Sequence, residues 1–302
     1  MTLPIDGDRL YVTDGGMETT LIYRDGFELP EFATFPLLDD EAGGEALRRY
    51  YASYAELADD LGAGLVLDTV TWRANADWGE KLGYDAPALA NVNRRAVALL
   101  RELRRDELPL VVSGCVGPRG DGYALGDTMS ADEAEHYHEP QIAVLAEEGV
   151  DVVSALTLTY AEEATGIARA AQRHGVPAVI SFTVETDGRL PSGQTLGEAI
   201  EQVDREAGGG PAYFMVNCAH PTHFADVLEA PWVERIAGIR ANASTKSHAE
   251  LDASDELDAG DPDELGERYG ELAGLLPRLT VVGGCCGTDE RHVAAVARAV
   301  TR

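Results

Sequence analysis

Residues 281–290 read VVGGCCGTDE, an apolar run that ends in two glycines and two adjacent cysteines. An uncharged run of this length before glycine is typical of a buried β-strand. The two cysteines are half of the four in the 302-residue chain. Because cysteine makes no useful helix cap, its position at a strand end indicates chemistry more than local structure.

Seven similar apolar runs precede this one. Helix-like stretches with apolar residues three and four apart separate them, for example at residues 44–62, 86–105 and 130–149. Eight alternations of strand and helix without a linker predict one (βα)8 TIM barrel domain, an α/β fold, over residues 1–302. The eight candidate strands are RLYVTD (9–14), GLVLDT (64–69), PLVVSG (109–114), VDVVSAL (150–156), PAVISF (177–182), AYFMVN (212–217), RIAGIRAN (235–242) and LTVVGG (279–284).

Two stretches are longer than a bare barrel requires. They are residues 25–44 after the first strand and residues 242–264 after the seventh. The second is polar and acidic, which predicts a solvated loop.

The charge of the chain excludes some classes of partner. The formal net charge is −29, so nucleic acids and anionic membranes would be repelled, and small molecules are the expected ligands. Lys81 and Lys246 are the only lysines among many arginines and carboxylates. This composition is typical of proteins from salt-loving organisms, whose concentrated cytoplasm screens like-charge repulsion.

The N-terminal segment MTLPIDGDRL lacks the apolar core of a signal peptide, and no long apolar run follows. We therefore expect a cytoplasmic protein. In a reducing compartment, clustered cysteines are more often metal ligands or catalytic groups than a disulfide framework. The thiols are expected to be free or bound to a metal.

In a parallel barrel the carboxyl ends of the strands converge on one mouth, where the active site is built. Polar residues close most of the candidate strands, although Asp, Asn and Thr also serve as caps for the following helices. The residues in these positions are Asp14, Asp68, Thr69, Gly114, Cys115, Thr157, Thr183, Glu185, Asn217, Cys218, Asn242, Cys285 and Cys286.

Three of these residues form a candidate metal site. Cys218 closes the sixth strand and Cys285 and Cys286 close the eighth, and the glycines of GGCCG (283–287) would let the backbone turn both sulfurs toward one ion. Three thiolates suit a tetrahedral Zn²⁺ with one open position. Cys115 is interpreted as an inert buried residue, which is the usual role of a single cysteine.

The ligand type indicates the reaction. Three thiolates make zinc a weak Lewis acid, but zinc still holds a substrate thiol, with its ordinary pKa of about 8.5, as a thiolate. The candidate site therefore predicts attack by a zinc-bound substrate sulfur on an electrophilic carbon, with no protein nucleophile.

The chain resembles the homocysteine S-methyltransferase family of zinc-dependent thiol methyltransferases. The resemblance rests on TDGGMETTL (13–21), FMVNCAHP (214–221) and VVGGCCGTDERHV (281–293), with support from residues 113–123 and 180–200. It implies that Cys218, Cys285 and Cys286 bind zinc and that homocysteine thiolate completes the tetrahedron. It also implies that Asp14 binds the substrate ammonium group and that the amides of Gly15 and Gly16 approach its carboxylate. Thr69 and Asn217 are further candidate substrate contacts.

The chain departs from the family pattern after the fourth strand, where members usually carry a glutamate that binds the substrate amine. The segment VSALTLTYAEEA (153–164) has Leu156 at that position. Either Glu162, Glu163 or Glu185 supplies the charge, or the acceptor is a thiol without an amine. Trp72 could stack on a cationic sulfonium donor.

Histidines offer weaker signals. His136 and His138 in HYHE are interpreted as surface residues of a helix, whereas His220, His223 and Asn242 are candidates to line the pocket. The overall prediction is zinc-dependent methyl transfer to homocysteine from a sulfonium such as S-methylmethionine or S-adenosylmethionine. The alternatives are another thiol, a corrinoid-protein donor, a zinc hydrolase, or a non-catalytic zinc- or thiol-binding protein. The oligomeric state is not predicted.

Overall fold

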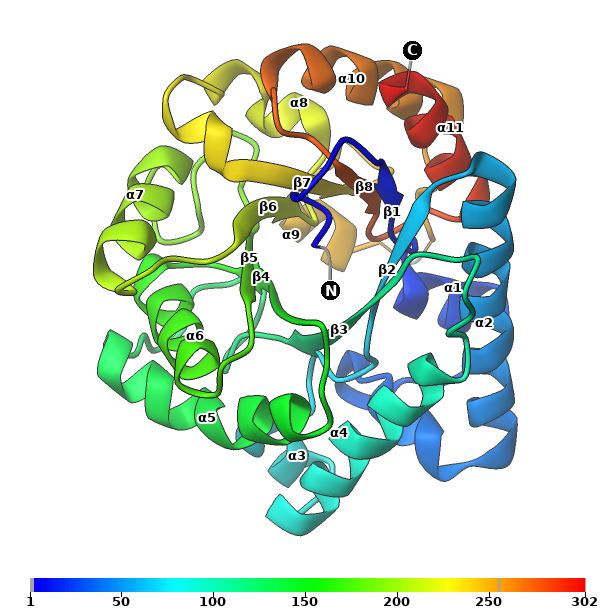
Figure 1. Cartoon of the computed structure of the whole chain (residues 1–302), viewed down its shortest axis with the longest axis vertical. Helices are drawn as coiled ribbons and strands as arrows, with labels where there is room; N and C mark the ends of the chain where they lie inside the picture. Colours follow the sequence, from blue (N-terminus) through cyan, green and yellow to red (C-terminus); the bar gives the residue numbers. More distant parts are fainter. Residues whose placement is uncertain (1–2, 255, 302) are drawn as a thin grey trace.

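A computed structural model describes residues 3–254 and 256–301, which are most of the predicted 1–302 domain. Eight parallel strands form a closed barrel in the order β1 to β8, and helices surround it (Figure 1). The prediction of a (βα)8 barrel is confirmed. The strands are β1 (Tyr11–Val12), β2 (Gly64–Asp68), β3 (Leu110–Val116), β4 (Val152–Leu158), β5 (Ala178–Phe182), β6 (Tyr213–Asn217), β7 (Ile236–Ala241) and β8 (Val281–Gly284).

The α-helices follow the strands around the outside of the barrel. They are α1 (Met17–Tyr23), α2 (Glu41–Leu61), α3 (Ala76–Lys81), α4 (Ala86–Arg101), α5 (Ala131–Glu147), α6 (Ala161–Arg173), α7 (Leu196–Glu206), α8 (Pro221–Phe224), α9 (His248–Asp252), α10 (Pro262–Leu275) and α11 (Glu290–Val300). Their ends match the sequence: Asp40 caps α2, Ser130 and Thr195 form capping boxes with glutamates, and Gly62 ends α2 at a φ of 64°.

Two apolar clusters hold the barrel together. The larger one lies between the strands and the surrounding helices, and it includes Leu65, Phe182 and Tyr269. The smaller one takes one or two residues from every strand, such as Tyr11 and Val281, and fills the barrel interior. A barrel interior packed in this way is not a pore, so ligands are confined to the mouth.

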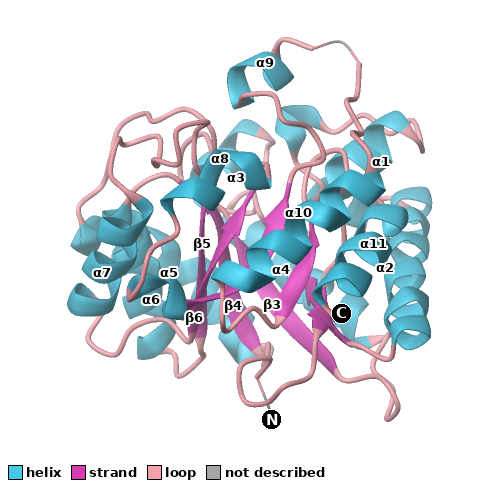
Figure 2. Cartoon of the chain, turned by 90° about the horizontal axis from the view of Figure 1, so that it is seen from above, coloured by secondary structure: helices cyan, strands magenta, loops and turns pink. Residues whose placement is uncertain are grey.

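Both insertions contain short helices. Residues 25–44 contain two short 3₁₀ helices, Pro30–Phe32 and Phe35–Asp39, and Phe35 is fully buried. Residues 242–264 contain α9, which stands above the barrel on the side opposite the N-terminus (Figure 2). After residue 244 the described residues of this segment are exposed or half-buried, as predicted for a solvated run, but they include a short helix that the sequence did not predict.

The surface interpretation of HYHE is wrong for one of its two histidines. His136 is exposed, but His138 is buried between α5 and α6, where its Nε2 lies 2.9 Å from Glu163 Oε1. Positions two apart on a helix point in different directions, so one histidine faces solvent and the other faces the neighbouring helix. Among the described residues, no helix has the length and apolar character that a membrane span requires.

Candidate functional site

The three predicted metal ligands meet at the mouth of the barrel. The sulfurs of Cys218, Cys285 and Cys286 lie within 4.8 Å of one another, and within the described chain they are the one group of three or more His, Cys, Asp or Glu residues so placed. Cys218 follows β6 with a φ of 55°, a left-handed conformation that is uncommon outside glycine. The carbonyl of this strained residue is held by Asn242 Nδ2 at 2.9 Å and His248 Nε2 at 2.6 Å.

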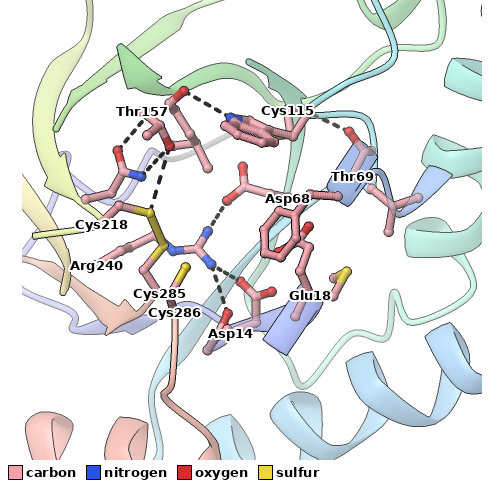
Figure 3. A pocket seen from close by; sticks show the side chains of 18 of the residues that line it. Asp14, Glu18, Asp68, Thr69, Cys115, Thr157, Cys218, Arg240, Cys285 and Cys286 are labelled. Atoms are coloured by element: carbon pink, nitrogen blue, oxygen red, sulfur yellow. Dashed lines mark hydrogen bonds and ion pairs between the residues drawn. A yellow bond between two sulfur atoms is a disulfide. The ribbon is translucent and has the colours of Figure 1, made fainter. Parts of the chain in front are cut away.

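Two of the three thiols are paired. Cys218 and Cys285 form a disulfide, with their Cα atoms 5.5 Å apart, while Cys286 is free (Figure 3). The expectation that these thiols are free or metal-bound is therefore wrong for this pair. The physical reason is proximity, because the ends of β6 and β8, which flank β7 at the barrel mouth, place the two Cα atoms within the usual range for a disulfide.

Once this disulfide is reduced, the donor set fits zinc. Sulfurs bound to one tetrahedral Zn²⁺ at about 2.3 Å lie roughly 3.8 Å from one another, so a cluster no wider than 4.8 Å needs little rearrangement. Burial raises the pKa of the Cys286 thiol to about 11. A metal ion would offset this penalty, because it stabilises the thiolate directly.

The glycines around the site make room for neighbouring groups. A Cβ on Gly16 would lie 2.5 Å from the carbonyl oxygen of Cys285, and a Cβ on Gly15 would lie 2.6 Å from Tyr54 Oη. A Cβ on Gly283 or Gly284 would overlap the side chain of Thr13 or Thr288. Neither Gly283 nor Gly284 has a positive φ, so packing explains glycine before the cysteines, whereas Gly287 after them has a φ of 80°, a backbone conformation that favours glycine.

A buried arginine holds two carboxylates in the wall of the same cavity. Arg240 of β7 reaches Asp14 Oδ1 with Nη2 and Asp68 Oδ2 with Nη1, each at 2.5 Å (Figure 3). Its Nε donates to the carbonyl of Gly284 at 3.2 Å. Tyr50 Oη donates to the second oxygen of Asp14 at 3.1 Å. Both oxygens of Asp14, the residue expected to bind the substrate ammonium, therefore already have protein partners.

Burial raises the pKa of Asp14 to about 6; Arg240 lowers this pKa and Asp68 raises it. Since the pKa is higher in the folded chain than in the unfolded chain, ionised Asp14 destabilises the fold. This penalty is absent below the ordinary aspartate pKa of 3.8 and complete above about pH 6.

An Asp14→Asn variant should gain stability relative to the wild type as the pH rises from 4 to 7. We expect the difference in unfolding free energy to change by about 2–3 kcal/mol over this window. Urea unfolding of both proteins at four pH values and one salt concentration measures it. A difference that does not vary with pH would contradict the raised pKa.

A polar network shapes the wall beside the sulfurs. Thr157 has a φ of 62°, which is strained for a β-branched residue. Asn217 holds this conformation: its Oδ1 accepts from the Thr157 amide at 2.9 Å and from Ser181 Oγ at 2.6 Å, and its Nδ2 donates to Thr157 Oγ1 at 2.8 Å. Asn217 thus supports the backbone that carries both Thr157 and Cys218.

Replacing Asn217 with alanine should weaken metal binding without removing a ligand. Loss of a group that orients ligands typically costs 10- to 100-fold in metal affinity, and the orphaned Thr157 amide should also lower stability by about 1–3 kcal/mol. Competition with a zinc chelator and thermal unfolding measure the two effects. Wild-type zinc affinity in this variant would show that the network does not position Cys218.

The remaining predicted site residues divide into two groups. Asp14, Gly15, Gly16, Thr69, Trp72 and Asn217 line the cavity with the cysteines, as do Asp68, Leu156 and Thr157. Trp72 is packed in place, since its indole N–H donates to the carbonyl of Leu156 at 3.2 Å and the Arg73 guanidinium lies 4.8 Å from its ring. Cys115 lines the cavity as well, and burial raises its pKa well above the ordinary value, as expected for an inert thiol.

Four candidates for the pocket lie outside its lining. His220 caps α8 and faces Glu264 of α10 at 3.8 Å, and burial lowers its pKa to about 4. Glu185 lies 3.6 Å from His248, and Asn242 holds the carbonyl of Cys218 from behind. Their predicted places in the pocket are corrected, because each contacts the loops that support the site. His223, too, bonds a loop carbonyl, that of Thr245, at 2.9 Å.

Three residues of the site were missed from the sequence. Arg240 lies within the apolar run RIAGIRAN. A single charged residue in a buried strand is uncommon, and this could have indicated a functional role. Tyr123 comes from the loop after β3, and its hydroxyl lies 3.5 Å from the sulfur of Cys218. His248 comes from the insertion after β7, and its ring centroid lies 4.9 Å from that of Tyr123. For Tyr123 and His248 the sequence carried no signal, because loop conformation places them.

Comparison with known proteins agrees with the geometry. The family model described as homocysteine S-methyltransferase matches residues 11–300. The three thiols lie at the mouth of the parallel barrel, where enzymes of this fold carry their active sites. The chain belongs to the homocysteine S-methyltransferase family, a family of methyltransferase enzymes.

Its relatives differ in length. The chain is 28% identical to methionine synthase of Mycobacterium leprae over 97% of its own residues, but it spans about a quarter (24%) of that protein. It is 24% identical to homocysteine S-methyltransferase 4 of Zea mays, covering 96% of this chain and 89% of the maize protein. Homocysteine methyltransferase MmuM of Escherichia coli shares the fold: its metallated form matches with a TM-score of 0.76 at 18% identity, covering 98% of this chain and 99% of MmuM.

Proposed function

We propose that this chain transfers a methyl group to a thiol bound at Cys218, Cys285 and Cys286, with homocysteine as the acceptor and methionine as the product. The observation that carries the proposal is the convergence of these three sulfurs within 4.8 Å at the barrel mouth. Family membership supports it, as do the names of the maize and mycobacterial relatives.

Zinc bound by the three cysteines would hold the acceptor sulfur as a thiolate near neutral pH. The protein would supply position and shape for the reaction. Thr157 and Tyr123 lie beside the sulfurs and Trp72 closes one side of the cavity. An acceptor thiolate would attack the methyl carbon of a sulfonium donor, forming one S–C bond while the donor's C–S bond breaks. The donor leaves as a neutral thioether, so charge is conserved and no protein nucleophile is needed.

The donor is proposed to be a free sulfonium such as S-methylmethionine or S-adenosylmethionine. The electrostatics of the cavity support a cationic donor, because Asp14, Glu18 and Asp68 line it with Arg240 as the only basic side chain among its described lining residues. The strongly acidic chain is also proposed to act in the cytoplasm of a salt-loving organism, with small molecules as its partners.

A direct assay tests the proposal. Reduced, zinc-loaded protein is incubated with homocysteine and, separately, S-methylmethionine, S-adenosylmethionine or methylcobalamin, and methionine is quantified by mass spectrometry. We expect methionine from a sulfonium donor. Tight zinc binding with no methionine from any donor would leave a zinc- or thiol-binding protein as the better interpretation.

Zinc-edge X-ray absorption supplies a second readout that does not depend on the donor. Addition of homocysteine should raise the number of sulfur neighbours of zinc by one. An unchanged spectrum with homocysteine, together with a gain for another thiol, would identify a different acceptor.

A further inference from the structure

The triad of Asp14, Asp68 and Arg240 carries one uncompensated charge at the wall of the cavity. All three side chains are at least nine-tenths buried, with exposed fractions of 3% for Asp14, 10% for Asp68 and 8% for Arg240. Two carboxylates face one guanidinium, so the formal charge is −1. Buried charge without a partner is costly, and a ligand that supplies the missing positive charge is favoured.

The hydrogen bonds of the triad show where such a ligand would bind. Arg240 occupies Asp14 Oδ1 and Asp68 Oδ2, and Tyr50 donates to Asp14 Oδ2. The remaining oxygen, Asp68 Oδ1, is buried and has no hydrogen-bond partner among residues 3–254 and 256–301. In Figure 3 one oxygen of Asp68 meets Arg240 and the other points away from it. Asp68 lines the same cavity as the three sulfurs.

We infer that Asp68, fixed in place by Arg240, receives the ammonium group of the acceptor, the role that the family resemblance assigns to Asp14. An ammonium group brings both the hydrogen that Asp68 Oδ1 lacks and the charge that the triad lacks. Burial is the main cause of the raised pKa of Asp14, and the nearby carboxylate of Asp68 adds to it. This inference rests on the proposed function, since it names the residue that recognises the amine of the acceptor at the same site.

The inference explains how the site accommodates Leu156. This apolar side chain lines the cavity and offers no carboxylate to an amine. Asp68, at the end of β2, supplies one to the same cavity, so the absence of an acid at position 156 does not exclude an amino thiol. Arg240 acts on the ammonium only through Asp68 and is therefore a positioning residue.

The test compares two acceptors that differ only in the amine. Homocysteine and 4-mercaptobutanoate are titrated into reduced, zinc-loaded protein by calorimetry, and kcat/KM for methylation is measured for each. We expect the wild type to favour homocysteine by about 10- to 100-fold in both measurements, which is the range for a hydrogen bond to a charged group. Equal or better binding of 4-mercaptobutanoate would overturn the inference, and this comparison needs no variant.

A pair of variants locates the preference. Asp68→Asn keeps an oxygen acceptor for Arg240 but replaces the free oxygen with an NH₂ donor, so homocysteine binding should fall about 10- to 100-fold while 4-mercaptobutanoate binding stays unchanged. Asp151→Asn is the matched control, because Asp151 is also buried and paired with an arginine, Arg104, but lies at the opposite end of the barrel before β4. This control should keep the wild-type preference.

The outcomes separate this inference from the proposed function. An equal loss of both thiols in Asp68→Asn would show a structural role and overturn the inference. Methylation of both thiols with equal kcat/KM would also overturn it but leave methyl transfer standing. Selective binding of homocysteine without methyl transfer from any donor would support the amino-thiol site and refute the proposed reaction.

Discussion

Replacing Cys286 with alanine should abolish both zinc binding and methyl transfer. Cys286 is one of three sulfurs within 4.8 Å, so its loss leaves two protein ligands, too few for a stable catalytic zinc site. Without zinc an acceptor thiol of pKa about 8.5 would be only a few per cent thiolate near pH 7. We expect zinc content below about one tenth of an equivalent and a decrease in kcat/KM of at least about 10³-fold.

Metal analysis of the reduced variant, together with the methionine assay, checks this result. Cys115→Ala is the matched control for metal content, because Cys115 is also a cysteine of the cavity wall but does not belong to the cluster of three. The control should retain one zinc per chain. Full zinc occupancy in Cys286→Ala would refute the ligand set. The paired thiols add a condition, since the Cys218–Cys285 disulfide must be reduced before either protein is loaded.

Replacing Arg240 with leucine should strongly lower the free energy of unfolding. The substitution leaves Asp14 and Asp68 as buried carboxylates without a cation, and breaking a buried ion pair from one side typically costs 3–5 kcal/mol. The cost should be about 3–5 kcal/mol at pH 7. It should be smaller at pH 5, where Asp14, with its pKa of about 6, is mostly protonated.

Urea unfolding at both pH values and one salt concentration measures the effect. Arg48→Leu is the control, because Arg48 forms an ion pair with Glu102 in which both side chains are about half exposed. Exposed pairs contribute about 0–1 kcal/mol. Similar losses of unfolding free energy in the two variants would show that the buried ion pairs of Arg240 stabilise the fold no more than an exposed pair does.

The barrel could be predicted from the sequence because its strands are buried on both faces and its helices on one. Those two patterns are local, so runs such as LTVVGG and stretches such as residues 44–62 indicate their own structure. The positions of Cys218, Cys285 and Cys286 followed directly, since strand ends converge in a closed parallel barrel. The family resemblance supported the same barrel, because TDGGMETTL, FMVNCAHP and VVGGCCGTDERHV occur in the family's order along the chain.

The rest of the site depends on contacts that no local pattern contains. Arg240 meets Asp14 across 226 residues and Asp68 across 172, and a pairing between such distant positions has no signature in a single sequence. Tyr123 reaches the sulfur of Cys218 and His248 reaches its carbonyl oxygen, both from segments whose conformation is set by tertiary packing. His220 was misplaced for the same reason: its position after Cys218 suggested the pocket, but capping α8 turns it away.

The pairing of β1 with β8 has a consequence for synthesis in the cell. Tyr11 and Val12 align with Val281 and Val282, so the first and last strands are neighbours. During synthesis on the ribosome, Asp14, Asp68 and Cys218 are therefore made well before Cys285 and Cys286. The sulfur cluster can form only after all eight strands of the barrel have been synthesised, so a growing chain that still lacks β8 is unable to bind a metal through all three ligands.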